Sequence, residues 1–363
     1  PADFVESGAK EATTVTQAPA EHTWFDTTVP RHERVAALVE AMTIEEKASQ
    51  MLHQASAIER LGIPEYDWWN ECLHGVARAG RATVFPQAIA WGATFDRDLV
   101  ARMADAIALE ARAKYHAALA VGNRTRYRGL TFWTPNVNLF RDPRWGRGHE
   151  TYGEDPYLTG EIGAAFVEAL QGDGEYLKAA ACAKHFAVHS GPEALRHEFD
   201  AVVSGRDLHE TYLPAFKKLV GAGVEAVMGA YNRTNGEPCC ASNLLMGILR
   251  DEWGFEGHFV SDCWAISDFH LHHKVTDGPF ESAALGVELG CDLNCGNTYE
   301  SVMGAFHEGL IDEEWIDRSV TRLMETRFKL GMFDPDEVVP LADTPTSVIN
   351  QDAHRELARE AAE

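Results

Sequence analysis

The chain has 363 residues, which is enough for two average domains or for one α/β barrel with a short extra segment. Hydrophobic residues make up 45% of it and charged residues 24%, a globular composition that can bury a large core. The net charge of −24 argues against nucleic acid or anionic lipid as a partner, and no apolar run reaches the roughly 18 residues of a membrane span.

Residues 1–29 are expected to form an N-terminal arm. The first part is polar, rich in Ala and Thr and without periodicity, as at the start of an exported mature protein, although an added tail would look similar. The chain begins at Pro1 rather than Met, as a processed or recombinant form would. A periplasmic or secreted location is therefore favoured over a cytoplasmic one.

Seven cysteines are present, so at least one is unpaired within the chain. None of the spacings is Cys-x-x-Cys, which disfavours a structural zinc site. The cysteines are also too sparse for a disulfide scaffold. Cysteine content by itself therefore leaves the compartment open.

Segments with apolar residues at helical spacing recur along the chain from about residue 30. A capping box at Thr43–Glu46 opens the first, which runs through Met51. Most of the later segments end near a glycine, as helices often do. The later expected helices are 98–115, 157–170, 207–220, 243–253, 281–289 and 311–330.

Short apolar or β-rich runs separate these helices. They are 130–139, 179–188, 226–231, 258–261 and 291–293. This strand–helix alternation predicts an α/β fold with a mainly parallel sheet. A closed (β/α)8 TIM-type barrel over residues 30–335 fits better than a doubly wound sheet, because GxGxxG and phosphate-loop motifs are absent. In such a barrel the site lies at the C-terminal ends of the strands.

The C-terminal part of the chain differs in composition. Residues 336–350 are rich in Pro and acidic residues and are expected to be a linker. Residues 351–363 resume a helical pattern with few apolar residues and then stop. We interpret them as the beginning of a second domain that this chain does not contain.

Two of the expected strands end in residues that could carry chemistry. The run 258–261 leads to Asp262, which would point into a barrel mouth or else act as a helix N-cap. The run at 179–183 leads to Lys184 and His185, whose side chains would face opposite sides of a regular strand. If both reach one ligand, the backbone must be irregular there, for example through a cis non-proline bond. Otherwise Lys184 points inward and His185 is a satisfied core residue.

Two further candidates come from another strand end and from a long loop. Tyr231 follows an apolar run and could hydrogen-bond a carboxylate on the neighbouring strand, or it is a core aromatic residue. The loop 140–156 contains three arginines, including Arg147. Arginine forks recognise carboxylates, phosphates or vicinal hydroxyls, although they also hold surface loops through pairs with Asp.

The segment Trp68-Trp69-Asn70-Glu71 combines two aromatic rings with an amide and an acid. Aromatic faces stack on the C–H faces of sugars, while acids and amides hold hydroxyl groups. The segment therefore suggests sugar binding, and two buried core tryptophans are the alternative.

Sixteen histidines also raise the hypothesis of a metal site. The best spacings are His185 with His189 and the run 270–273, but no HExxH motif is present. We therefore expect neither a metal ion nor a cofactor, and we expect 270–273 to be a solvated loop.

Together these residues resemble glycoside hydrolase family 3, in its β-glucosidase and β-xylosidase-like N-terminal catalytic domain. The similar segments occur in the order typical of the family. They are WWNECLHG (68–75), FRDPRWGRGHETYGEDP (140–156), AKHF (183–186), VMGAYNRTNGEPCCAS (227–242) and SDCWAI (261–266). The Glu71 segment, the SDC signature and GCDLNCGNTY (290–299) are closer to the β-xylosidase-like branch.

The resemblance implies a (β/α)8-type first domain followed by an α/β sandwich domain. It implies a retaining exo-β-glycosidase that releases a terminal β-D-glucosyl or β-D-xylosyl unit from an oligosaccharide or aryl β-glycoside. Asp262 matches the nucleophile, which would form a covalent glycosyl intermediate. Arg147, Lys184 and His185 match the residues that hold the hydroxyls of the terminal sugar.

The resemblance assigns three more positions. Glu71 matches the residue that binds the far hydroxyls, and Tyr231 matches the tyrosine beside the nucleophile. Trp264 lies near the aromatic wall of the family but is displaced by one residue from the common SDW pattern. We expect Lys184, Arg147 and Tyr231 to keep the pKa of Asp262 low, because opposite charges and hydrogen bonds favour a carboxylate.

The second catalytic carboxyl is expected to be missing from this chain. In two-domain members of the family the acid/base Glu comes from the C-terminal domain, which would be the partner here. Single-domain β-N-acetylglucosaminidases instead use an Asp–His pair in the loop after the KHF strand. His197 occupies that loop here, although the KHFPGHG pattern is absent, and it is a second candidate for the acid/base. Two further hypotheses are a catalytically incomplete sugar-binding barrel and a metal-dependent hydrolase.

Overall fold

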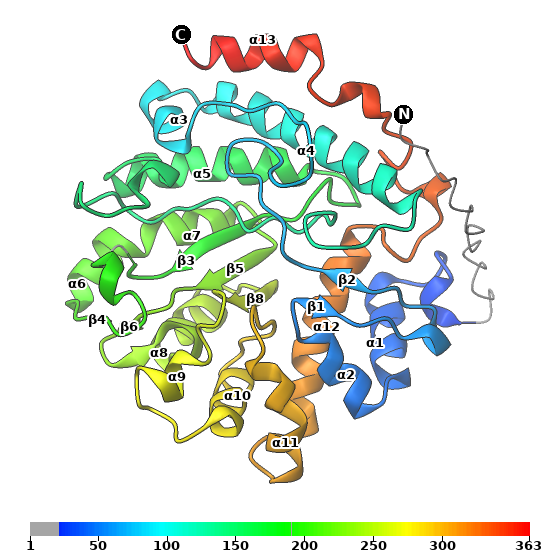
Figure 1. Ribbon diagram of the computed structural model, residues 1–363, viewed down its shortest axis with the longest axis vertical. Coiled ribbons are helices and arrows are strands. Elements are labelled where there is room, and N and C mark those ends of the chain that lie inside the picture. Colours follow the sequence, from blue (N-terminus) through cyan, green and yellow to red (C-terminus); the bar gives the residue numbers. More distant parts are fainter. Residues whose placement is uncertain (1–21, 190) are drawn as a thin grey trace, which may run out of the picture.

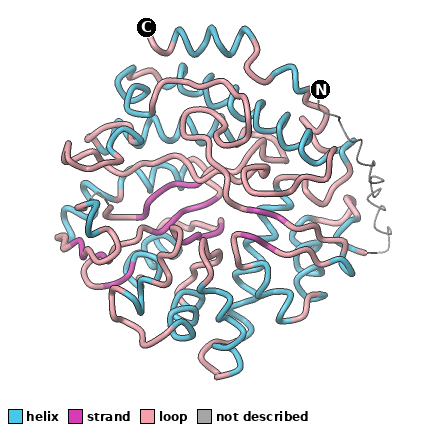
Figure 2. Tube along the Cα trace, viewed as in Figure 1, coloured by secondary structure: helices cyan, strands magenta, loops and turns pink. Residues whose placement is uncertain are grey.

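A computed structural model describes residues 22–189 and 191–363 (Figure 1). Residues 1–21 of the expected arm therefore lie outside the described part. Helices surround a central group of strands, and loops make up much of the rest (Figures 1 and 2). None of the helices in the described part is long and apolar enough to cross a membrane.

The expected helices are largely present, with several shorter ones added. The first helices, α1 to α5, are Arg31–Ala41, Ile44–Gln50, Ala88–Thr94, Arg97–Leu119 and Pro156–Gln171. The next, α6 to α10, are Gly205–Asp207, Pro214–Gly221, Asn243–Met246, Asp268–Leu271 and Pro279–Glu288. The last, α11 to α13, are Val302–His307, Glu313–Lys329 and Asp352–Glu360.

Local sequence explains where the helices begin and end. The capping box of α2 forms as predicted, since Thr43 Oγ1 accepts from Glu46 N at 3.3 Å and Glu46 Oε2 accepts from Thr43 N at 2.8 Å. Helix α5 begins with Asp155 as its cap and a proline in its first turn. It ends at Gly172, whose φ of +75° suits a residue without a Cβ.

Two predicted helices are interrupted by wide helical turns. The predicted helix 207–220 divides into α6 and α7, and Leu213 N between them donates to Leu208 O, five residues back, at 3.0 Å. Pro214 has no N–H to continue the regular pattern, which explains the wide turn. The predicted helix 243–253 likewise ends as α8 at Met246 and continues as a wide turn to Glu252.

Within the described residues the strands form three small sheets, none of which is closed. The strands β1 to β4 are Gln54–Ala55, Tyr66–Asp67, Cys182–Phe186 and Asp200–Ala201. The strands β5 to β8 are Ala226–Gly229, Arg233–Thr234, Glu237–Pro238 and His258–Ser261. The central sheet is parallel in the order β3-β5-β8, β1 pairs with β2, and β4-β6-β7 form the third. The fold is therefore α/β, as predicted, without one continuous sheet.

Two predicted strands are reduced to isolated bridges. The run 130–139 pairs only at single residues, Thr131 with Ala180, Phe132 with Asn70 and Asn136 with Lys184. Pro135, which has no N–H, interrupts the run. The run 291–293 pairs through Leu293 with Val260. These segments are buried but do not form regular ladders.

The central sheet places the candidate residues at one edge. The register aligns Cys182 with Ala226 and Ala226 with His258, so the carboxyl ends of β3, β5 and β8 lie together. The peptide bond between Lys184 and His185 is cis, which is the irregularity considered from the sequence. The pairing of β3 with β5 shifts register between Lys184 and Phe186.

The C-terminal segment packs on the outside of helix α4, at the top of Figure 1. The buried carboxylate of Glu110 on α4 accepts from His354 Nδ1 on α13 and from Asn350 N, both at 2.8 Å, and from Thr83 N at 2.9 Å. The expected linker is not fully extended, since it contains short 3-10 turns and buries Val339. Helix α13 is present where the sequence predicts it.

Candidate active site

Asp262 directly follows β8 at the carboxyl edge of the central sheet. Its backbone N donates to Gly229 O on β5 at 3.2 Å, and its Oδ1 accepts from Cys263 N at 2.8 Å. The side chain is 11% exposed, and Oδ2 has no hydrogen-bond partner in the described part of the chain. One oxygen of a buried carboxylate is thus left available.

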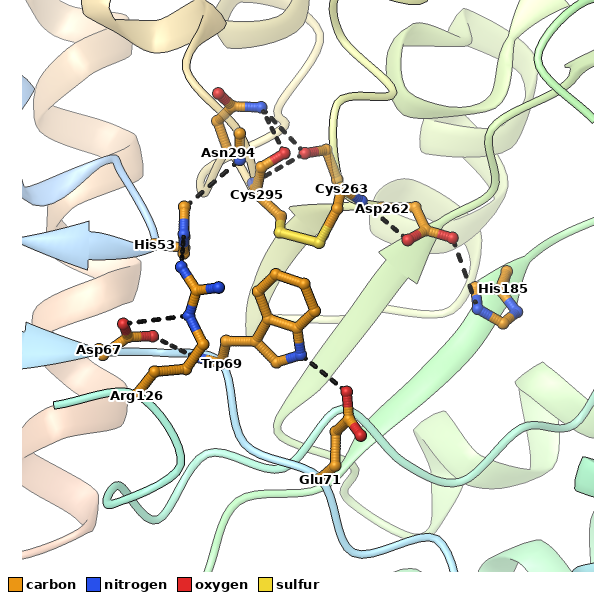
Figure 3. Close-up of a disulfide and its surroundings, with 12 residues drawn as sticks. His53, Asp67, Trp69, Glu71, Arg126, His185, Asp262, Cys263, Asn294 and Cys295 are labelled. Carbon is orange, nitrogen blue, oxygen red and sulfur yellow. Dashed lines mark hydrogen bonds and ion pairs between the residues drawn. A yellow bond between two sulfur atoms is a disulfide. The ribbon is translucent and has the colours of Figure 1, made fainter. Parts of the chain in front are cut away.

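His185 on β3 faces that oxygen (Figure 3). Its Nε2 lies 3.5 Å from Asp262 Oδ2. Asn138 Oδ1 lies 3.0 Å from Nδ1, which assigns the proton to Nδ1 and leaves Nε2 as an acceptor. Burial, together with Arg147, lowers the pKa of His185 well below its usual range. The ring is therefore neutral.

Arg147 completes this group. Its Nη1 donates to His185 Nε2 at 3.3 Å, while Nε and Nη2 donate to the two oxygens of Glu150 at 2.8 and 2.7 Å. Burial alone would raise the pKa of Glu150, but the hydrogen bonds from Arg147 lower it. Glu150 was not selected from the sequence, although its position three residues after Arg147 was a usable signal.

The expectation of a low pKa for Asp262 is wrong. Burial raises the pKa of this carboxyl above its ordinary value of 3.8, although Arg147, the Cys263 N–H, Lys184 and Tyr231 all oppose that effect. Sequence reasoning counted the neighbouring charges and left out the desolvation of the carboxylate, which dominates here.

Lys184 and Tyr231 lie in the same region. Lys184 is half-buried, and burial and the Arg147 charge lower its pKa. Tyr231, two residues after β5, is buried, and its pKa is raised by burial first and by the adjacent Asp262 second. Tyr231 therefore remains a neutral hydrogen-bond donor beside Asp262.

Glu71 is held by two donors. Its Oε1 accepts from Trp69 Nε1 at 2.9 Å and its Oε2 pairs with Arg78 Nε at 3.2 Å. The guanidinium carbon of Arg126 lies over the Trp69 ring, 4.5 Å from its centroid, and the Trp133 ring stacks on Trp69 with centroids 5.5 Å apart. Trp69 thus orients Glu71 and is itself held by aromatic and cation contacts.

Trp68 and Trp264 have opposite environments. Trp68 is fully buried and packs edge-on against His258 and Tyr66, so the core interpretation of Trp68 holds. Trp264 is 51% exposed and has φ of +66°, a left-handed conformation that is uncommon for a bulky residue. Its side chain is therefore at the surface of the site region.

A disulfide joins Cys263, next to Asp262, to Cys295 in the loop after the 291–293 run. Figure 3 shows it beside Trp69, with Glu71, Asp262 and His185 in the same view. The other five cysteines are free and buried. The sequence did not indicate this pairing, because seven cysteines allow many.

His197, the second candidate for the acid/base, is engaged at both ring nitrogens. Its Nδ1 lies 2.8 Å from Asp268 Oδ2, and its Nε2 accepts from Arg196 Nε at 3.3 Å. The predicted solvated loop at 270–273 is wrong in part, since His270 and Leu271 belong to α9 and His273 is buried. No group of three or more His, Cys, Asp or Glu side chains within residues 22–189 and 191–363 could hold a metal ion.

Comparison with known proteins extends this description. The sequence profile of the glycosyl hydrolase family 3 N terminal domain matches residues 31–326. A xylan 1,4-beta-xylosidase of Xylanibacter ruminicola is 46% identical over 339 residues, which are 91% of this chain and 39% of that protein. The probable beta-D-xylosidase 7 of Arabidopsis thaliana is 40% identical over 361 residues, covering 93% of this chain and 46% of that protein.

Solved structures are also similar to this chain. A GH3 exo-beta-xylosidase in complex with a xylobiose aziridine activity-based probe has a TM-score of 0.88 and 30% identity, covering 96% of this chain and 47% of that chain. A beta-glucosidase of Listeria innocua in complex with isofagomine has a TM-score of 0.77 and 31% identity, covering 91% and 50%. The chain thus spans about half the length of the relatives it matches. From this match, the chain belongs to glycosyl hydrolase family 3, through the N-terminal domain of that family.

Proposed function

We propose that this protein is a retaining exo-β-glycosidase that releases a terminal β-D-xylosyl or β-D-glucosyl unit. The observation that carries the proposal is the free Oδ2 of Asp262, a buried carboxylate oxygen facing His185 beside Arg147. The xylosidases and beta-glucosidases among its relatives support the substrate class. The xylosyl unit is the first choice, because the curated relatives above are named xylosidases.

The mechanism is a double displacement. Asp262 Oδ2 attacks the anomeric carbon, the bond from that carbon to the leaving oxygen breaks, and a glycosyl ester forms. Water then attacks the same carbon and gives one proton to the group that protonated the leaving oxygen, the ester bond breaks, and Asp262 is released as a carboxylate. Arg147, Lys184 and His185 hold the sugar hydroxyls, and Glu71 accepts from the far hydroxyls. These contacts strengthen as the ring flattens toward the transition state, which is how they contribute to the rate.

The proton donor for the leaving group is supplied from outside this chain. Three other carboxylates of the site region are already engaged: Glu71 by Trp69 and Arg78, Glu150 by Arg147, and Asp268 by His197. The pKa of Glu150 is lowered by Arg147 despite burial, which is the opposite of what a resting acid needs. The greater length of the relatives is consistent with a further domain.

The strands of the protein form an irregular (β/α)8-type barrel. Single parallel bridges, Leu52 with Asn294, Val260 with Leu293 and Asn70 with Phe132, support this arrangement. With the bridge of Asn136 to Lys184, they connect the central sheet, the β1–β2 pair and the neighbouring segments in a circular order. Residues 30–335 are this catalytic unit, 336–350 is a linker, and 351–363 begins a second unit.

The function is tested by hydrolysis. The chain should turn over dinitrophenyl β-D-xyloside, whose leaving group needs little protonation, and should hydrolyse xylobiose far more slowly. Normal turnover of xylobiose by this chain alone would overturn the assignment of the proton donor to another domain. Binding of xylose without any turnover of the aryl xyloside would instead support a catalytically incomplete sugar-binding barrel.

Two competing functions make different predictions. If the protein is a β-N-acetylglucosaminidase that uses His197 as its acid, the variant His197→Ala should lose activity on substrates with poor leaving groups. It should keep its activity on substrates with good leaving groups. The engagement of both ring nitrogens disfavours this role. A metal-dependent hydrolase would lose activity on treatment with a chelator, whereas the double displacement would not.

A further inference from the structure

Loops from three neighbouring strands contact one another beside Asp262. The loop after β3 carries Arg196 and His197, and Tyr231 follows β5. Asp268 follows β8, at the start of α9. Each of these strands also carries or leads to residues of the proposed site: Lys184 and His185 on β3, Tyr231 after β5 and Asp262 after β8. A contact between the loops therefore fixes the positions of these residues relative to one another.

The contacts form a continuous chain of side chains. The buried Asp268 accepts from His197 Nδ1 at 2.8 Å, and His197 Nε2 accepts from Arg196 Nε at 3.3 Å. Because Arg196 must donate, Nε2 of the ring is the acceptor and Nδ1 carries the proton that Asp268 accepts. Glu193 adds a second anchor, since its Oε1 accepts from Arg196 Nη1 at 3.0 Å.

The end of this chain lies on Tyr231. The guanidinium carbon of Arg196 is 5.0 Å from the centroid of the Tyr231 ring, and the His197 ring is edge-on to it at 4.7 Å. A guanidinium over an aromatic face is attracted by the ring, and two contacts on one ring restrict its rotation. Tyr231 also lies close enough to Asp262 to hydrogen-bond it and for each group to affect the pKa of the other.

We propose that Arg196 is a positioning residue for the glycosidase reaction, holding Tyr231 against Asp262, and that His197 and Asp268 hold Arg196 in place. This inference rests on the proposed function. In this proposal the Asp268–His197 pair holds Arg196 in position and does not donate the proton to the leaving group. Arg196 touches no reacting atom and acts through Tyr231.

The test measures covalent labelling of the chain by dinitrophenyl 2-deoxy-2-fluoro-β-D-xyloside. Asp262 attacks the anomeric carbon, dinitrophenolate leaves with the electron pair of the broken bond, and the fluorine slows the hydrolysis of the ester. The reaction needs the nucleophile and its neighbours but no proton donor. The maximal rate constant and the half-saturating concentration are measured separately.

A double-mutant cycle isolates the contact. Arg196→Met should lower the maximal labelling rate about fivefold to tenfold, with the half-saturating concentration changed less than about twofold. In a Tyr231→Phe background, where the hydroxyl beside Asp262 is gone, Arg196→Met should change the rate less than about twofold. Arg196→Lys, which keeps the charge but loses the planar fork, should give an intermediate loss.

Arg144→Met is the matched control. Arg144 pairs with Asp142 in the neighbouring loop, and its side chain is 89% exposed. The variant Arg144→Met removes the same charge as Arg196→Met, but its labelling rate should match that of the unchanged chain within about twofold. Equal losses from Arg196→Met with and without Tyr231→Phe, or a loss confined to the half-saturating concentration, would overturn the proposal. If the unchanged chain is not labelled at all, the proposed function fails instead.

Discussion

Asn138 Oδ1 accepts from two groups of His185, its backbone N–H at 2.8 Å and its ring Nδ1–H at 3.0 Å. The amide of Asn138 also donates from Nδ2 to His185 O at 2.9 Å. A single side chain thus fixes both the backbone and the tautomer of His185. The consequence is that Nε2, the nitrogen beside Asp262 and Arg147, is an acceptor.

Replacing Asn138 by Ala should therefore affect both stability and the site. Four buried hydrogen bonds of the side chain are lost, including one from Nδ2 to Ala187 O, which should lower the free energy of unfolding by about 2–4 kcal/mol. His185 then loses its fixed tautomer, and covalent labelling should slow about tenfold or more. Urea unfolding and labelling kinetics measure the two effects. Unchanged labelling in a folded variant would show that the tautomer of His185 does not matter.

Asp262→Asn should remove the nucleophile without weakening the fold. Labelling and turnover should fall at least about a thousandfold. Because burial raises the folded-state pKa of Asp262 above 3.8, the folded state binds this proton more tightly than the unfolded state. The resulting stability is complete below the unfolded-state pKa and is lost as the pH rises through the folded-state pKa.

A neutral Asn at position 262 does not ionise, so the variant does not lose this stability as the pH rises. The free energy of unfolding of Asp262→Asn should therefore exceed that of the unchanged chain at pH 7, and the difference should shrink toward acid pH. Denaturant unfolding at a series of pH values measures this. A variant that is less stable than the unchanged chain at pH 7 would contradict the direction of the pKa shift.

Arg147 is expected to set the pH at which the labelling rate falls on the acid side of the pH–rate profile, here called the acid limb. Labelling requires ionised Asp262, so its rate falls as the pH falls through the pKa of that carboxyl. Arg147 is foremost among the groups that lower this pKa, so Arg147→Met should raise it and move the limb to higher pH. Glu150→Gln, which keeps the arginine, is the comparison. A limb that stays in place in Arg147→Met would argue against this role.

The Cys263–Cys295 disulfide should stabilise the fold and the site together. Replacing both cysteines by Ser should lower the free energy of unfolding by about 2–4 kcal/mol, because the bond closes a loop across 32 residues of sequence separation. Labelling should also slow, because the residue next to Asp262 loses its anchor. Reductant should bring the unchanged chain to the stability of the double variant and leave that variant unaffected.

The contact between α13 and α4 should contribute to stability in a pH-dependent way. Burial disfavours ionised Glu110, but hydrogen bonds from Thr83 and His354 lower its pKa below the ordinary value. This stability is present above the unfolded-state pKa and is lost as the pH falls through the folded-state pKa. Glu110→Ala should cost about 2–4 kcal/mol at pH 7. Glu356→Ala, on the exposed side of α13, should cost less than about 0.5 kcal/mol.

The sequence was informative where local rules decide the structure. Strand β8 was predicted at its observed bounds, because an apolar run is limited by Gly257 and Asp262. The capping box of α2 and the end of α5 at Gly172 were also predicted. These features depend on neighbouring residues alone. The run at 130–139 was mistaken for a strand because its apolar pattern continues through Pro135.

Features that depend on tertiary contacts were missed. The pairing of Cys263 with Cys295, the fixing of His185 by Asn138 and the packing of Arg126 on Trp69 all involve residues distant in sequence. The raised pKa of Asp262 depends on how deeply the carboxyl is buried, which its neighbours in sequence do not reveal. The roles of the site residues remain predictions that the experiments above address.

The most direct test is to locate the covalent adduct. After treatment with dinitrophenyl 2-deoxy-2-fluoro-β-D-xyloside, the chain should gain the mass of one fluoroxylosyl group, and peptide mass spectrometry should place it on Asp262. The Asp262→Asn variant should gain nothing. An adduct on a different carboxylate, or turnover that persists in Asp262→Asn, would contradict the account.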